Sequence, residues 1–201
     1  MQPTFVSAIL ARPDAHALKI GERAGAVAFV AVLTAIAAQI SIPLPFTPVP
    51  LTFQPMVVLV GAMALGGRLA MASQLAYLAM GVAGLPVFAA SPVLPHGIAR
   101  LMGPTGGYLM AYPFAAFVAG SLAERRLDRR YLTSVAAMAA GLALVYAGGV
   151  LWLGVLMPAP RGIASAIAAG FSPFIAADLI KLGVAAMVMP RLWALTAWRA
   201  R

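Results

Sequence analysis

The stretch PFIAADLIKLG, residues 173–183, places Asp178 and Lys181 inside an apolar run that continues to Met189. In a helix, residues three positions apart lie on one face, so both charges point the same way. A lone charge at membrane depth costs about 2.5–3.5 kcal/mol on insertion scales. Two interpretations follow. The charges form a structural ion pair that locks one helix against its neighbours, or they belong to a site for a polar ligand.

The composition predicts an all-α membrane protein that forms a single integral domain over residues 1–201. The chain is 63% hydrophobic and only 9% charged, with a mean hydropathy of +0.95. Soluble domains carry about 25% charged residues. A spanning helix needs about 20 apolar residues, and the apolar runs predict six transmembrane helices. Cysteine is absent, which excludes disulfides and thiol chemistry. The net charge of +9 lies mainly in loops and tails and does not indicate nucleic-acid binding.

Proline, glycine and charge divide the chain into an arm at 1–19, a helical bundle at 20–190 and a tail at 191–201. We expect helices near 20–40, 56–65, 69–82, 106–123, 131–156 and 173–190, with a short interfacial helix at 163–170. Five prolines in 41–55 predict an extended loop. Residues 84–108 contain four prolines but are too apolar to be disordered, and they predict irregular outer loops that form a ligand lid.

The positive charges predict the topology. With six helices, one side of the membrane holds eleven of the 14 Lys and Arg residues. They are Arg12, Lys19, Arg23, Arg68, Arg125, Arg126, Arg129, Arg130, Arg191, Arg199 and Arg201. The other side holds Arg100 and Arg161, and Lys181 lies within the last helix. Because positive loops stay in the cytoplasm, we expect both termini there and the lid outside.

Few catalytic mechanisms are compatible with this sequence. There is no GxxxxGK[ST] phosphate loop, and the predicted topology separates the two histidines, His16 and His96. Asp178 is the only acid away from the cytoplasmic side, so paired-carboxylate catalysis lacks a second member. We therefore expect no enzyme, cofactor or metal, and favour capture of a small molecule from outside. Arg100 is a candidate for a ligand carboxylate or an ordinary surface arginine.

Four motifs occur in order along the chain: PFTPVPLTFQ (45–54), GLPVF (84–88), GPTGGY (103–108) and DLIK (178–181). Together they resemble the BioY family, the biotin-binding S components of energy-coupling factor (ECF) transporters, over about residues 20–190. The resemblance implies a high-affinity biotin-binding subunit in a bacterial-type plasma (inner) membrane. It also implies three partners, namely a transmembrane coupling protein and two cytoplasmic ATPase subunits.

The resemblance maps the ligand site onto Asp178, Lys181 and Arg100. The predicted substrate-binding set also includes Phe88, Ser91, Gln54, Tyr146, Trp152, Gly103 and Gly106. Family members often carry asparagine shortly after GLPVF, where this chain has Ala89, Ala90 and then Ser91 as the substitute. Small residues on the first helix either pack internally or dock the coupling protein; they are Ala24, Ala28, Ala31 and Ala35.

The sequence leaves open which cation takes the biotin carboxylate. We expect Arg100 on the carboxylate, Asp178 on a ureido N–H, and Lys181 beside Asp178. Phe88, Tyr146 and Trp152 either pack the apolar ligand body or are ordinary packing residues. The alternative functions are a stand-alone biotin transporter, an S component for another vitamin, a membrane-embedded enzyme and a purely structural subunit.

Overall fold

Three long apolar helices form the frame of the bundle in the computed structural model of this chain, which describes residues 4–10, 19–90, 97–156 and 162–199. They are α2 (Ile20–Gln39), α6 (Gly106–Leu122), which η2 (Ala123–Leu127) extends, and α7 (Tyr131–Leu156). Each is long and apolar enough to cross a membrane. A fourth candidate is a bent pair that combines α8 (Gly162–Gly170) with the segment Ile175–Leu195, which covers α9 (Ile175–Ala185) and most of α10 (Val188–Arg199).

Two shorter helices, α3 (Gln54–Leu65) and α4 (Gly67–Val82), pack between α2 and α6. The turn between them requires glycine, because Gly66 has a φ of +82° and a Cβ there would lie 2.4 Å from Glu124 Oε1. Five of the six segments that we predicted to be helical each contain one helix, and the sixth, residues 173–190, is interrupted between α9 and α10. Length and composition identify three spans among the described residues, or four with the bent pair, so six membrane crossings remain a prediction.

The proline-rich segment after α2 forms a small antiparallel hairpin where the sequence predicted only an extended loop. Strands β1 (Ser41–Ile42) and β2 (Leu51–Thr52) pair with Ser41 opposite Thr52 and Ile42 opposite Leu51. The prolines lie outside these four residues, so the short ladder loses no N–H donor. At the tip of the hairpin, Thr47 Oγ1 donates to the Ala169 carbonyl of α8 over 2.7 Å.

Part of the predicted lid forms a helix, and another part packs against the helical bundle. The lid contains the short helix α5 (Ile98–Met102). Its first part is held by Gln39, whose Nε2 donates to the carbonyls of Pro86 and Phe88 over 3.3 Å each. The Phe88 ring packs edge-on against Tyr77, with 5.6 Å between ring centroids. Ser91 of the lid lies outside the described residues.

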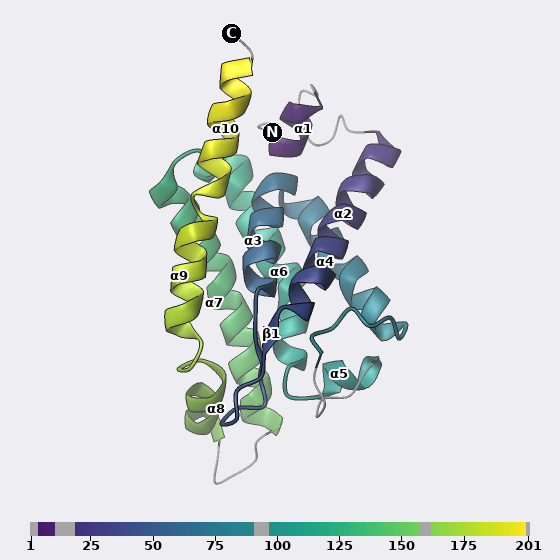
Figure 1. Ribbon diagram of the computed structural model, residues 1–201, viewed down its shortest axis with the longest axis vertical. Coiled ribbons are helices and arrows are strands. Elements are labelled where there is room, and N and C mark those ends of the chain that lie inside the picture. Colours follow the sequence, from purple (N-terminus) through teal and green to yellow (C-terminus); the bar gives the residue numbers. More distant parts are fainter. Residues whose placement is uncertain (1–3, 11–18, 91–96, 157–161, 200–201) are drawn as a thin grey trace.

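The terminal helices gather at the opposite end of the molecule. Figure 1 shows α1 (Phe5–Ile9) and α10 at one end, with the hairpin, α5 and α8 at the other. We call these the terminal end and the hairpin end. The sequence predicted that the last helix ends near Pro190, but helix resumes at Val188 and continues to Arg199. Pro190 is the third residue of α10, where a missing N–H removes no intrahelical hydrogen bond.

Candidate functional site

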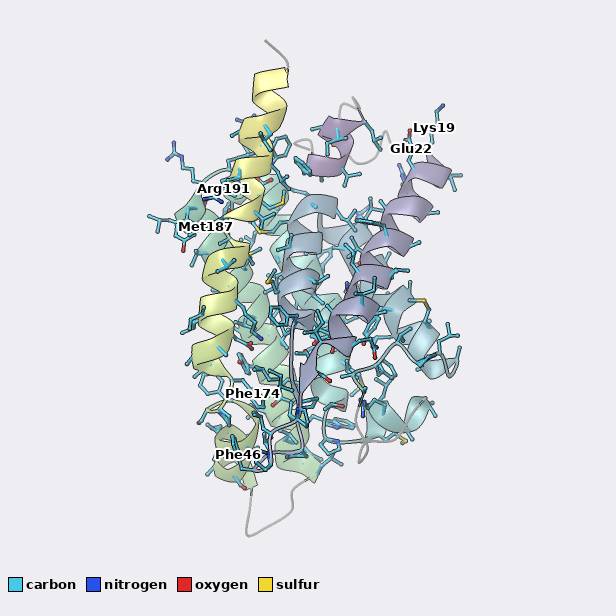
Figure 2. The ribbon with its side chains drawn as sticks, in the orientation of Figure 1. Lys19, Glu22, Phe46, Phe174, Met187 and Arg191 are labelled. Carbon is cyan, nitrogen blue, oxygen red and sulfur yellow. The ribbon has the colours of Figure 1, made fainter. Side chains whose placement is uncertain are left out.

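A cavity lies at the hairpin end, between the hairpin, α3, α5, α6, α7 and α9. It encloses about 620 Å³ of space between atoms, part of which is open to solvent. Its apolar wall consists of Val49, Pro50, Leu51, Pro55, Ala89, Leu109, Val145 and Phe174. Its polar groups belong to Thr52, Gln54, Arg100, Thr105, Tyr108, Tyr112, Tyr146 and Asp178. Figure 2 shows Phe174 just below α9, close to the hairpin.

Asp178 lies in the first turn of α9, where the helix dipole favours a negative charge. Its side chain is buried, with 7% of the residue exposed. Tyr146 of α7 donates its hydroxyl to Oδ2 over 2.6 Å, and Lys181 forms an ion pair with Oδ1. The Tyr146 ring is itself held edge-on by Phe171, at 4.9 Å between centroids. The carboxylate therefore has a fixed orientation at the cavity wall and keeps lone pairs for a further donor.

Lys181 lies behind Asp178 and outside the set of residues that line the cavity. Its Nζ also donates to the Thr52 carbonyl of β2 over 2.8 Å. One side chain thus joins α9 to the hairpin and neutralises Asp178. The expected pairing of the two charges on one helix face is present, and the contact with the hairpin is an addition that the sequence did not predict.

Arg100 is the one cation among the described residues that line the cavity. It lies on α5 and is 3% exposed. Nη2 donates to the Ala89 carbonyl, which fixes the guanidinium to the lid, while Nη1 is buried with no partner among the described residues. Burial lowers the Arg100 pKa, yet an arginine remains charged at neutral pH. In Figure 1, α5, which contains Arg100, and α9, which contains Asp178, lie on opposite sides of the hairpin.

Gln54, one of the predicted substrate-binding residues, lines the cavity and connects it to the lid. Its Nε2 donates to the Tyr77 hydroxyl over 2.7 Å, and that hydroxyl donates to the Val87 carbonyl over 3.2 Å. Phe88 does not line the cavity. It packs instead against Tyr77 and over Gly81, where a Cβ would lie 2.1 Å from the Phe88 ring.

Three further predicted residues shape the turn between α5 and α6 without lining the cavity. Trp152 donates its indole N–H to the Gly103 carbonyl over 2.9 Å. A Cβ on Gly106 would lie 1.8 Å from the Leu101 carbonyl oxygen, so only glycine allows this turn to close. These residues determine where Arg100 and the start of α6 lie.

Sequence reasoning missed four polar residues in the wall: Thr52, Thr105, Tyr108 and Tyr112. The first three belong to the motifs quoted above, so a residue-by-residue reading of those motifs would have identified them. Tyr112 lies one helical turn after Tyr108, and this spacing places both on one face of α6. Tyr108 is already engaged, because its hydroxyl donates to the Gly170 carbonyl over 2.7 Å.

The alanines predicted to dock a partner do not form one free face of α2. Ala24 and Ala28 are exposed. Ala31 is 1% exposed, and Ala35 packs against the hydrophobic core. Two of the four therefore pack within the bundle, which was the alternative interpretation. No group of three or more potential metal ligands occurs among the residues that the structure describes.

The fold and the cavity together define a helical membrane protein with a small-ligand site at one end of its bundle. The family model described as the BioY family matches residues 14–198, and the chain belongs to this family. The probable biotin transporter BioY of Pyrococcus horikoshii is 39% identical over 166 residues, which are 83% of this chain and 93% of that protein. The biotin transporter BioY of Thermotoga maritima is 41% identical over 160 residues, 80% of this chain and 89% of that protein.

The structural comparison agrees. The crystal structure of the S-component for biotin from an ECF-type ABC transporter matches with a TM-score of 0.73 and 26% sequence identity. The match covers 89% of this chain and 95% of that chain.

Proposed function

We propose that this protein captures biotin as the substrate-binding S component of an ECF-type uptake transporter. One observation supports the proposal most directly: Arg100 and Asp178, both buried and oppositely charged, line one apolar cavity. Biotin has matching chemistry. Its ureido ring offers N–H donors, its thioether ring and chain are apolar, and its chain ends in a carboxylate. The names of the related proteins point to the same ligand.

In this proposal Asp178 accepts a hydrogen bond from a ureido N–H, and Arg100 binds the carboxylate through Nη1. Arg100 lines the cavity and its Nη1 has no partner in the described chain, whereas Lys181 contacts Asp178, the Thr52 carbonyl and the Phe53 ring, which are all protein groups. Lys181 accordingly acts as a positioning residue that holds Asp178 and the hairpin. Apolar side chains such as Val145 and Phe174 pack the ring and chain.

The hairpin and the lid cover the bound ligand. The hairpin is tied to the helices at its tip by Thr47 and near its base by Lys181. The start of the lid is tied by Gln39 and Arg100. Because these are a few side-chain contacts to backbone carbonyls, opening the site requires no helix to unfold. We infer that loop opening admits biotin and that Arg100, which contacts both lid and ligand, couples binding to closure.

The proposed partners are a transmembrane coupling protein and two cytoplasmic ATPase subunits, which supply the energy for release. The proposed location is a bacterial-type plasma membrane with both termini in the cytoplasm. The terminal end is strongly basic, with described charges that include Lys19, Arg68, Arg125, Arg130 and Arg191. This agrees with the tendency of positive segments to remain inside. Figure 2 shows Lys19 and Arg191 at this end of the molecule.

The test is a calorimetric titration of biotin into the purified protein in detergent, with thiamin and riboflavin as controls. Saturable binding of biotin alone is expected. Binding of a control vitamin instead would reassign the ligand, and no binding by folded protein would overturn the proposal. Biotin uptake in cells with and without coupling proteins then tests the partners: uptake without them would show stand-alone transport.

A further inference from the structure

The GPTGGY segment, residues 103–108, forms the turn from α5 into α6, and most of its residues have evident structural roles. The Gly103 carbonyl accepts the Trp152 N–H, and Gly106 leaves room for the Leu101 carbonyl. Gly107 allows α6 to approach α7, since a Cβ there would lie 2.4 Å from the Gly148 carbonyl oxygen. Close packing alone therefore explains why Gly106 and Gly107 are glycines.

Thr105 differs because its hydroxyl has no structural partner among the residues described. The residue is 7% exposed and lines the cavity. It occupies the N-cap of α6, where a threonine hydroxyl usually accepts a backbone N–H of the first turn. Here its φ and ψ are −88° and −5°, helical rather than extended values, and its side chain makes no capping bond. Buried polar atoms normally have partners, so this oxygen requires an explanation.

A second unsatisfied atom belongs to α5, the helix that precedes this turn. Arg100 Nη1 is also buried, also without a partner in the described chain, and also belongs to a residue of the cavity wall. Thr105 is the N-cap of α6, a helix of 17 residues, and Arg100 lies on α5, which the turn connects to α6. Helix amino ends favour negative charge because their first N–H groups have no intrahelical acceptors. A cation, a hydroxyl without a partner in the described chain and the residue that begins a helix thus line the same cavity.

We propose that Thr105 contacts the ligand and donates a hydrogen bond from its hydroxyl to a carboxylate oxygen that Arg100 also binds. This inference rests on the proposed function and assigns a residue of the same site. A hydroxyl can donate or accept, but a carboxylate only accepts, so the direction of the bond follows from the charge that Arg100 selects. Thr105 is then a specificity-determining residue that favours acids over their neutral esters.

The experiment compares two ligands in three variants. Biotin and biotin methyl ester share every ring atom and differ in the charge of the chain end. Thr105→Val removes the hydroxyl and keeps the β-branched shape, and Thr105→Ser restores the hydroxyl. Thr133→Val removes a hydroxyl at the terminal end, where Thr133 donates to the Arg130 carbonyl, and serves as the matched control.

Thr105→Val is expected to weaken biotin binding about tenfold or more, since a hydrogen bond to a charged group is lost. Its affinity for the methyl ester should change less than about threefold, because a neutral ester is a weaker acceptor. Thr105→Ser should restore the preference for the acid, and Thr133→Val should leave both affinities unchanged. Thr105→Ala repeats the measurement if valine perturbs folding, as judged by circular dichroism.

The outcomes separate this inference from the proposed function. Normal biotin binding by Thr105→Val would overturn the inference and leave the proposed function intact. An equal loss for acid and ester would also overturn it, because it would show a contact to the ring or a structural role. Absence of biotin binding by the unaltered protein would instead overturn the proposed function, and this inference with it.

Discussion

Two buried aspartates lie at opposite ends of this bundle. Each pairs with a cation and accepts a hydrogen bond from an aromatic side chain, yet only one of them lines the cavity. At the hairpin end, Asp178 pairs with Lys181 and accepts a hydrogen bond from Tyr146. At the terminal end, Asp128 pairs with Arg129 and accepts a hydrogen bond from the Trp193 indole. The two residues are 7% and 2% exposed.

The difference lies in what surrounds each pair. The Arg129 guanidinium carbon lies 3.3 Å from the centroid of the Trp193 ring. The Trp193 and Phe5 rings are nearly perpendicular, with 5.3 Å between their centroids. Asp128 thereby joins α10 and α1 to the loop before α7. Burial raises the Asp128 pKa, whereas the Trp193 hydrogen bond and the Arg129 charge lower it. A buried ion pair therefore does not by itself indicate a site. What distinguishes the pair that we propose to act at the ligand site is the cavity beside Asp178, whose wall includes the unsatisfied polar atoms of Arg100 and Thr105.

The largest expected effect comes from neutralising each aspartate in turn. Asp178→Asn should weaken biotin binding on the order of a hundredfold, because the ureido acceptor loses its charge and Lys181 remains buried without its partner. Asp128→Asn should leave the affinity within about twofold and lower the Tm. Calorimetry and circular dichroism melting measure the two effects. Unchanged affinity in Asp178→Asn would remove Asp178 from the site.

Arg100→Gln should have the next largest effect, a loss of about tenfold to a hundredfold in biotin affinity, since a charge-assisted bond to the carboxylate disappears. The methyl ester should be affected much less. Arg129→Gln is the matched control at the terminal end and should not change the affinity for either ligand. An equal loss of acid and ester binding in Arg100→Gln would show that Arg100 acts only by holding the lid.

Lys181→Met should cost about tenfold in affinity, less than Asp178→Asn, if Lys181 positions the site without contacting the ligand. The variant should also loosen the hairpin, because the bond to the Thr52 carbonyl is lost. The absence of native cysteine allows spin labels at Phe46→Cys and Leu151→Cys, two exposed positions. A broader distance distribution between the labels is expected. If the distance distribution is unchanged and biotin affinity falls as much as in Asp178→Asn, Lys181 contacts the ligand directly.

The smallest effect on binding should come from Trp193→Phe, which removes the indole donor and keeps an aromatic ring. Stability should fall by about 1–3 kcal/mol, because the buried Asp128 carboxylate loses a hydrogen bond. Biotin affinity should stay within about twofold. Tyr146→Phe makes the corresponding change at the hairpin end and should reduce affinity. Equal effects of the two variants on binding would mean that the ends of the bundle are coupled.

Much of the architecture could be predicted from local sequence patterns. Apolar runs predicted the helices α2, α3, α4, α6, α7 and α9, and the three-residue spacing of Asp178 and Lys181 placed these two residues on one face. The predictions failed where one segment depends on another. The hairpin forms because residues on either side of four prolines pair with each other. Helix α10 is held against the bundle because Trp193 donates a hydrogen bond to Asp128 and packs against Phe5.

The sequence by itself determined the membrane class, the helical segments and, through its four motifs, the family. Only the tertiary structure decided which cation faces the cavity. The sequence favoured Arg100 over Lys181 for the carboxylate without settling the choice. In the structure Lys181 bonds to a carbonyl 129 residues away, and Arg100 is anchored on the lid with Nη1 unpaired in the described chain. Local periodicity reports which residues share a helix face. It does not report which distant backbone groups will satisfy a buried charge. We base the proposed roles on this tertiary contact: the cation whose partners are all protein groups positions the site, and the cation with an unpaired nitrogen binds the ligand.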